Sequence, residues 1–462
     1  MFFVAYAIAP AIAQDAQPST DNPRTAATSD ASTTNQPAPV SSAPTEPPVD
    51  KVEPESSAGG LPAGQSKETV QEPPENSQST PAKVDDVPKK PINSRIVVLS
   101  WAGAYGQAQN QAIIEPLARD LELEIERRTH GNGAASADAD VMEHDQSSLI
   151  AACAAGQLVE MRSLLTPAER SGFATTDAGG DFLANSVSDC GVPTFAWSSM
   201  LIANGEAMKR LAKRRYRAPT GLASLLDVKR YPGRRALIRS PKRLLEMMLM
   251  GKGVDREDVY NVLATRQGQD AAFETLDKLS KHVLWVDGPR EALLALDQED
   301  VTIAMTFSGR AFRRLIASRL QPIWDGHVID YASWAVPKTS TNRDKAKRFI
   351  LAATRAEKLA AQARIWPYGP MRRSALLLAQ RHALLDADLN KFMPTSDLRL
   401  GQGLVFNAAF WATHGRALQT RFDDWLAGVP LGIRVPVPVK APPAPLPPLP
   451  KLDNTATGGP SQ

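Results

Sequence analysis

The stretch between Tyr6 and Trp101 contains no aromatic residue, and this gap limits how much of the chain can fold. From about 14 to 93 the chain consists mainly of Pro, Ala, Ser, Thr, Gln and Glu. Such a segment cannot bury enough apolar surface to offset the entropy lost on ordering, so we expect it to be disordered. Prolines recur over 435–448 in the spacing typical of polyproline II structure, which predicts a second disordered tail at 429–462. The folded part then runs from about 94 to 428.

The first thirteen residues are apolar and end in Ala11-Ile12-Ala13, a small-x-small triplet of the kind that signal peptidases cleave. We interpret 1–13 as the end of a secretory signal peptide, which predicts a periplasmic protein. The true start is expected upstream because no basic residue precedes the apolar run, and a disordered apolar terminus is the alternative. No apolar run reaches about 18 residues, so the sequence predicts no membrane-spanning helix.

Charge and motif content exclude several classes of function. The net charge is +3, and Lys and Arg alternate with carboxylates along the chain, so we expect no nucleic-acid partner. The chain has no GxSxG, HExxH or phosphate-binding loop motif, so we predict that it is not an enzyme and uses no cofactor. The histidines are scattered without the spacing of metal ligands, so we predict no metal site; they are His130, His144, His282, His327, His382 and His414.

Cys153 and Cys190 are the only cysteines of the chain. We interpret an isolated pair in an exported protein as one disulfide. For a loop of this size the loop-entropy model predicts that it stabilises the folded state by roughly 4 kcal/mol. The pair has neither CxxC spacing nor clustered histidines nearby, so it falls short of the ligands of a zinc site.

Apolar strand patterns alternate with amphipathic helix patterns, which favours an α/β fold with ligands at the carboxyl ends of its strands. Strands are predicted at 96–100, 121–128, 140–143, 194–203, 235–239, 284–286, 301–307 and 332–336. Helices are predicted at 105–121, 146–155, 243–252, 256–264, 269–281, 290–296, 345–354, 357–365 and 407–425. We expect two lobes joined by crossing strands, 94–203 with 335–428 as lobe 1 and 204–334 as lobe 2, and a ligand in the cleft between them.

Short motifs follow one another in order from about Ile96 to Leu426. They include Ser100-Trp101-Ala102-Gly103-Ala104-Tyr105, Asp189-Cys190-Gly191-Val192-Pro193, Tyr231-Pro232-Gly233-Arg234-Arg235, Trp334-Ala335-Val336-Pro337-Lys338, Tyr368-Gly369-Pro370 and Arg421-Phe422-Asp423-Asp424-Trp425-Leu426. In this order they resemble the periplasmic spermidine/putrescine-binding proteins. The resemblance implies a type II periplasmic-binding fold, a disulfide between Cys153 and Cys190, and a monomeric receptor that delivers a polyamine to the membrane permease of an ABC importer.

The resemblance also indicates which residues would bind a polyamine, because ring faces suit its methylenes and carboxylates suit its ammonium groups. Trp101 and Tyr105 match the first aromatic cluster of the family, and Phe307 falls where a Trp is typical. Glu246 and Asp330 are the carboxylates best placed to meet a cation. We therefore predict these five residues as the ligand-binding set.

Two departures from the family pattern leave other functions open. The crossover helix that usually joins the second and third strands is replaced by about ten residues at 129–138. The acidic pair expected after the fifth strand is replaced by Arg239-Ser240-Pro241-Lys242-Arg243, so an anionic or zwitterionic solute held by Arg239 or Arg243 is an alternative. A different alternative is a degenerate family member that serves as an envelope interaction or sensory protein.

Overall fold

The computed structural model describes residues 94–130, 138–170, 180–317 and 320–429, all within one compact unit. The predicted signal peptide, both predicted tails apart from Val429, and most of the short crossover at 129–138 therefore lie outside the described residues. In the described part of the chain, no helix is both long enough and apolar enough to span a membrane.

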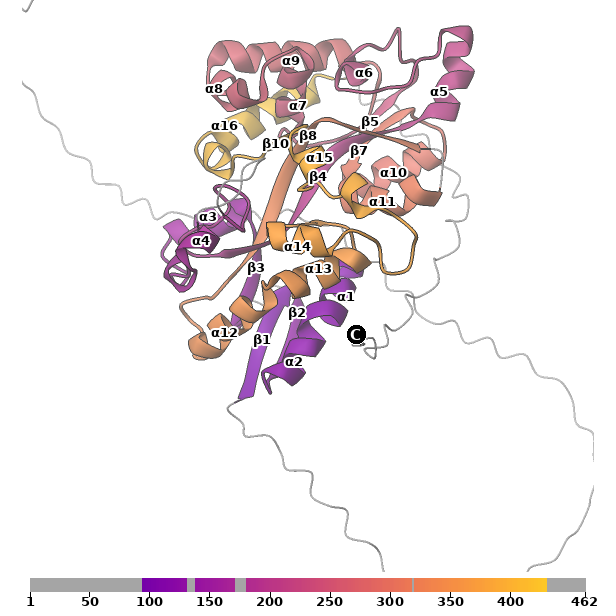
Figure 1. The fold of residues 1–462 in the computed structure, drawn as a ribbon. Coiled ribbons are helices and arrows are strands. Elements are labelled where there is room, and N and C mark those ends of the chain that lie inside the picture. The colour runs from indigo at the N-terminus through magenta and orange to yellow at the C-terminus, as the bar shows by residue number, and fades with distance from the viewer. Residues whose placement is uncertain (1–93, 131–137, 171–179, 318–319, 430–462) are drawn as a thin grey trace, which may run out of the picture. The chain divides into compact units, whose positions relative to one another are not determined.

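Ten strands of the described residues form one mixed sheet in the order β2-β1-β3-β8-β4-β7-β5-β6, with β10 paired to β8 and β9 paired to β4 (Figure 1). β1 pairs in parallel with both β2 and β3, and β5 pairs in parallel with both β6 and β7. The strands are β1 Arg95–Ser100, β2 Glu124–Thr129, β3 Val141–Asp145, β4 Val192–Asn204, β5 Arg235–Ile238, β6 Val283–Val286, β7 Ile303–Phe307, β8 Leu320–Ala335, β9 Gly369–Pro370 and β10 Gly403–Val405.

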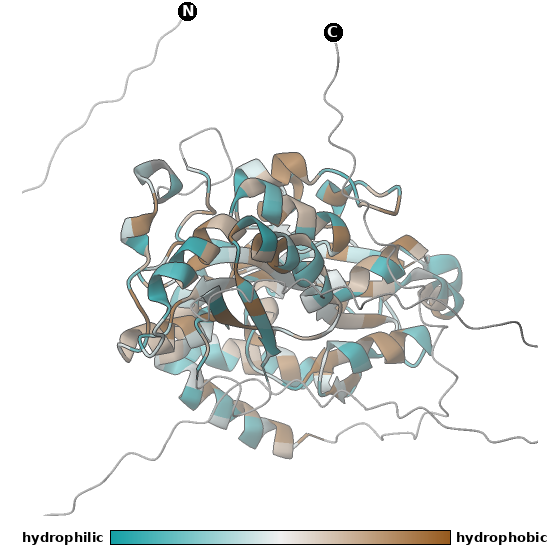
Figure 2. Cartoon of the chain, turned by 90° about the horizontal axis from the view of Figure 1, so that it is seen from below, coloured by the Kyte–Doolittle hydropathy of each residue, from teal (hydrophilic) through white to brown (hydrophobic). Residues whose placement is uncertain are grey.

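Helices follow most of these strands and cover the sheet. They are α1 Gly103–Gln109, α2 Glu115–Asp120, α3 Gln146–Ala154, α4 Pro167–Arg170, α5 Gly205–Ala212, α6 Ala223–Leu226, α7 Leu244–Gly251, α8 Val259–Leu263, α9 Arg266–Ser280, α10 Pro289–Asp297, α11 Ser308–Ala317, α12 Arg343–Ala353, α13 Ala356–Ile365, α14 Arg373–Leu378, α15 Asp397–Leu400 and α16 Ala408–Ala427. Hydrophilic and hydrophobic residues alternate along many of them, as expected for helices with one buried face (Figure 2).

The predicted helix at 105–121 is interrupted by one wider turn. α1 continues into a π-helical turn, Asn110–Ile114, before α2 begins. Pro116 lies in the first turn of α2 and cannot donate to the carbonyl of Ala112, four residues earlier. The ladder of hydrogen bonds therefore shifts just ahead of the proline.

The two longest strands, β4 and β8, pair antiparallel and join the two halves of the sheet. Their register runs from Val192 opposite Trp334 to Asn204 opposite Leu320, with two irregularities between. Figure 1 shows these strands running between two groups of helices, one with α1, α2, α12 and α13 and the other with α7, α8, α9 and α10. The predicted strand at 332–336 is therefore only the last part of a 16-residue strand.

Separate apolar clusters lie in the two halves. The first joins β1 and β3 to α12 and α13, with Trp334 and Phe349 fully buried. The second joins α7 and α9 to α16, and side chains from Leu404 to Phe422 belong to it. The lobe limits that the sequence suggested stay a prediction. Those limits assign α16 to lobe 1, but α16 packs against α7 and α9, which they assign to lobe 2.

Candidate functional site

Two of the helices that follow strands, α3 and α7, begin near the middle of β8. α3 begins at Gln146 directly after β3, and α7 begins just after Arg243. Both residues contact Asp330, which lies inside β8 opposite Trp197 of β4. Segments from both halves of the sheet thus meet at one carboxylate on the strand that joins them.

Asp330 is buried and already has two strong partners. Arg243 Nη2 donates to its Oδ2 in an ion pair, and Gln146 Nε2 donates to its Oδ1 at 3.1 Å. Burial raises the pKa of the Asp330 carboxyl, whereas the charge of Arg243 opposes that rise. The carboxylate predicted to meet an ammonium group is therefore neutralised by a neighbouring guanidinium.

Arg243 keeps hydrogen-bonding capacity after pairing with Asp330. Its Nε is buried and has no hydrogen-bond partner among the described residues, while its guanidinium carbon lies 5.0 Å from the centre of the Phe406 ring. Beside it, burial followed by the charge of Arg243 lowers the pKa of Lys242. A buried donor without a partner is costly unless a ligand or water supplies an acceptor. The geometry therefore favours an acceptor, such as a carboxylate, at Arg243.

A cavity of about 570 Å³ lies next to this pair, a size within the range of small-molecule sites. Gln146 lines it and also binds Asp330, and Phe406 lines it and also packs on Arg243. Among the described residues, no charged side chain lines the cavity, which is bounded by Gln146, Leu149, Ile150, Leu183, Ala184, Asn185, Ser188, Tyr331, Leu400, Val405, Phe406, Asn407, Ala408 and Ala409.

Glu246, the other carboxylate of the predicted set, is fully buried under α16. Its Oε1 accepts hydrogen bonds from Trp411 Nε1 at 2.6 Å and from the hydroxyl of Tyr260 at 3.3 Å. Burial raises the pKa of Glu246 to about 7, against the opposing effect of these hydrogen bonds. It lies one helical turn beyond Arg243 but is not among the residues that line the cavity.

The predicted aromatic residues lie at the ends of β1 and β7. The ring of Trp101 packs on that of His130, with centroids 4.4 Å apart, and Phe307 is half-buried at the end of β7. Tyr105 is buried, and its hydroxyl donates to Glu143, a carboxylate that also accepts from Ser100 Oγ at 2.6 Å. These three residues do not line the 570 Å³ cavity.

Six residues that the sequence did not identify contribute polar groups or rings to the cavity: Gln146, Asn185, Ser188, Tyr331, Phe406 and Asn407. Gln146 could have been inferred, because it is the first helical residue after a strand, a common ligand position. Phe406 and Asn407 gave no such signal, since they follow a three-residue strand far along the chain.

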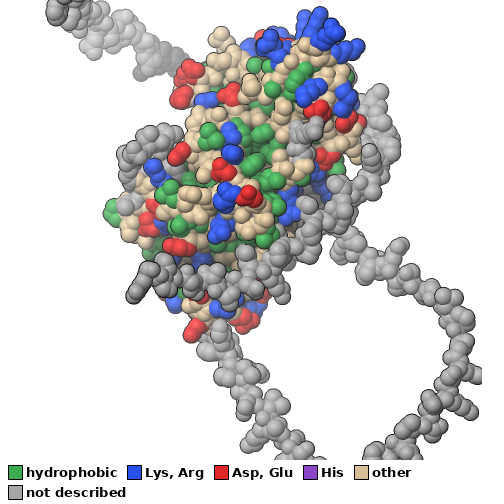
Figure 3. Space-filling view, turned by 45° about the vertical axis from the view of Figure 1, so that its right-hand side comes forward, with side chains coloured by type: hydrophobic (Ala, Val, Ile, Leu, Met, Phe, Trp, Pro, Cys, Tyr) green, Lys and Arg blue, Asp and Glu red, His purple; other side chains and the backbone are tan. Residues whose placement is uncertain are grey.

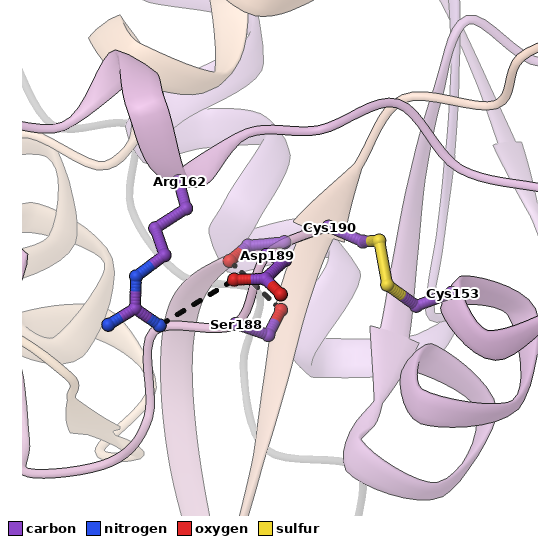
Figure 4. The surroundings of a disulfide bond; sticks show 6 residues. Cys153, Arg162, Ser188, Asp189 and Cys190 are labelled. Carbon is purple, nitrogen blue, oxygen red and sulfur yellow. Dashed lines mark hydrogen bonds and ion pairs between the residues drawn. A yellow bond between two sulfur atoms is a disulfide. The ribbon is translucent and has the colours of Figure 1, made fainter. Parts of the chain in front are cut away.

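The disulfide Cys153–Cys190 joins two walls of the cavity (Figure 4). Cys153 lies in α3, the helix that supplies Gln146, Leu149 and Ile150, and Cys190 ends the loop that supplies Leu183 to Ser188. The two Cα atoms are 5.8 Å apart. Beside the bond, Arg162 Nη1 lies 3.7 Å from the carboxylate of Asp189. The predicted disulfide is thus confirmed, and it holds α3 against the loop.

Comparison with known proteins decides the family. Residues 125–388 match the model of the family described as bacterial extracellular solute-binding protein, more than half of the chain. The chain belongs to this family. Solute-binding proteins of this family bind their ligands without chemical change, so the prediction that the chain is not an enzyme is confirmed.

Individual relatives of this solute-binding protein bind different ligands. The γ-aminobutyric acid-binding protein of Pseudomonas aeruginosa is 29% identical over 342 residues, which cover 72% of this chain and 91% of that protein. The structure of MotA from A. tumefaciens B6 with glucopine is 22% identical over 72% of this chain and 99% of that one, with a TM-score of 0.58. The spermidine/putrescine transporter protein PotD of Streptococcus pneumoniae is 16% identical with the same coverage and a TM-score of 0.54. The predicted α/β periplasmic-binding fold is confirmed by these likenesses.

Proposed function

We propose that this solute-binding protein is a periplasmic receptor that serves an ABC importer, and that its ligand is a small zwitterion with a carboxylate and an amine, such as γ-aminobutyrate. The observation that supports the ligand class best concerns Arg243: among the described residues its buried Nε has no partner, and the neighbouring cavity has no charged lining side chain. A ligand carboxylate would complete the hydrogen bonding of that guanidinium. The γ-aminobutyric acid-binding relative from Pseudomonas aeruginosa supports the same class.

The polyamine predicted from the sequence is the second candidate, supported by the rings of Trp101 and Tyr105 at the end of β1. Its two ammonium groups would need carboxylates, but Asp330 is paired with Arg243, and Glu246 is bound by Trp411 and Tyr260. Breaking the Arg243–Asp330 pair to admit a cation would leave a partly buried guanidinium without its carboxylate, which costs at most about 3–5 kcal/mol. This cost is why we favour the zwitterion.

A series of four-carbon ligands tests the proposal, because only their end groups differ. Isothermal titration with γ-aminobutyrate, putrescine and succinate compares a zwitterion, a dication and a dianion on chains of one length. We expect heat of binding with γ-aminobutyrate and at least tenfold weaker binding of the other two. Tightest binding of putrescine would restore the polyamine assignment. No heat with any of the three would favour another solute or the envelope sensory role.

A further inference from the structure

The end of α5 and the turn after it form an exposed basic corner, residues 209–217, in the half of the sheet that contains β5 to β7. Six of its nine residues are exposed cations, and Figure 3 shows Lys and Arg side chains gathered at the top of that view. The cations are Lys209, Arg210, Lys213, Arg214, Arg215 and Arg217. A mixed-charge surface would intersperse carboxylates here, so this density of one sign is unusual for a merely solvated face.

Only two of the cations are neutralised by carboxylates in the described structure. Lys209 pairs with Glu206 at 2.9 Å, and Arg210 pairs with Glu299. No ion pair joins Lys213, Arg214, Arg215 or Arg217 to another described residue. The corner therefore keeps about four uncompensated positive charges within five residues.

An apolar side chain stands among these cations. Leu211 is 56% exposed, between the paired Arg210 and the unpaired Lys213. Behind it the ring of Tyr216 lies 5.4 Å from Lys209 Nζ, and the Tyr216 hydroxyl contacts Gln321 of β8. The turn is thus anchored to the sheet while its cations and Leu211 face solvent. Basic residues around an exposed leucine are the pattern of surfaces that bind at the lipid–water interface.

We infer that the basic corner docks this receptor on the anionic phospholipid headgroups of the membrane. Near such a surface each Lys or Arg adds electrostatic attraction, and Leu211 adds apolar contact at the acyl boundary. An acidic protein segment could also satisfy the charges, and the experiment below distinguishes it from a lipid surface. The inference concerns a different surface from the cavity and does not depend on which solute binds there.

Co-sedimentation of the full chain with vesicles tests this inference. The test variant is Lys213→Gln/Arg214→Gln/Arg215→Gln, and the matched control is Arg290→Gln/Arg348→Gln/Arg416→Gln, three exposed cations elsewhere. Both variants change the formal net charge from +3 to 0, so any difference between them reports position. Vesicles of phosphatidylglycerol with phosphatidylethanolamine are compared with pure phosphatidylcholine at 50 and 500 mM salt.

We expect the unmodified chain to bind only the anionic vesicles and to release them at high salt. The corner variant should bind on the order of 100-fold more weakly, which is three charges at about 1 kcal/mol each with 1.4 kcal/mol per factor of ten. The control should lose less than threefold. The inference would be overturned if both variants lost the same vesicle affinity, or if the unmodified chain bound phosphatidylcholine vesicles as tightly as the anionic ones. Displacement by soluble polyglutamate at equal charge would also overturn it and would assign the corner to an acidic protein segment.

Discussion

Arg243 and Asp330 decide which charge the site prefers, because the partly buried guanidinium and the buried carboxylate neutralise each other. Arg243 precedes α7 with a left-handed backbone conformation, φ of +69°, and its side chain contacts Asp330 of β8. The Nε–H of this guanidinium has no acceptor among the described residues, so it could donate to a ligand carboxylate. The same pair makes an added cation unfavourable.

Variants of this pair separate folding from binding. Arg243→Gln alone leaves Asp330 buried and unpaired, so we expect a loss of about 3–5 kcal/mol in the free energy of unfolding. The double variant Arg243→Gln/Asp330→Asn removes both charges and should recover most of that stability. It should nevertheless bind γ-aminobutyrate at least tenfold more weakly, because the ligand carboxylate loses its partner. Denaturant melts and calorimetry measure the two effects. Normal affinity in the double variant would exclude Arg243 from the site.

Glu246 is a stabilising group only while it is protonated. Its pKa is about 7 in the folded protein and near 4.5 when exposed, so the folded state binds the proton more tightly. The resulting stability is present in full below pH 4.5 and is lost as the pH rises through about 7. Glu246→Gln should remove this dependence and raise the free energy of unfolding at pH 8 by up to about 3 kcal/mol.

The comparison of unmodified and Glu246→Gln proteins isolates this group, because other titrating residues are common to both. The variant should exceed the unmodified chain in melting temperature by more at pH 8 than at pH 5. A variant that is less stable than the unmodified protein at pH 8 would show that Glu246 is charged and usefully paired in the folded state.

At the scale of elements, the disulfide determines how α3 lies against the loop that ends at Cys190. Cys153→Ser/Cys190→Ser should lower the free energy of unfolding by roughly 4 kcal/mol on the loop-entropy model. Because both walls of the cavity depend on this bond, ligand affinity should fall as well. Thermal melts of the variant and of the reduced unmodified protein should agree. An unchanged melting temperature would mean that packing alone holds α3 in place.

Helices and strands with a clear hydrophobic pattern could be predicted from the sequence. A strand that contains Pro and Gly could not be predicted over its full length. β1 and α13 were predicted within a residue or two, because apolar runs and helical periodicity mark them. The first part of β8 was missed because Pro322 and Gly326 are typical of turns. Gly326 has a φ of +74°, and a Cβ there would lie 2.1 Å from Leu222, so the glycine permits a close approach within the strand.

The site could be predicted only where local sequence determined it. Asp330 and the basic segment 239–243 were identified, but their ion pair was not, since 87 residues separate Arg243 from Asp330. The cavity combines α3, the loop before Cys190, β8 and the start of α16. These elements come together only when the sheet has formed. Phe406 and Asn407 therefore could not be inferred as cavity residues from the sequence around them.

At the scale of the whole described unit, the cavity is bounded by elements from both halves of the sheet. α3 follows β3 in the first half, and α16 packs with α7 and α9 in the second. α3 and α16 also contact each other, and Gln146 and Asn407 both line the cavity. A ligand there would contact both halves, as the hinge closure of periplasmic receptors requires.

The most direct test of this account is a crystal structure of the chain with γ-aminobutyrate bound. We predict that the ligand lies in the cavity lined by Tyr331 and Phe406, with its carboxylate about 3 Å from the guanidinium of Arg243. The Arg243–Asp330 pair should remain intact. A ligand bound elsewhere, or an ammonium group against Asp330 with Arg243 turned away, would contradict the account.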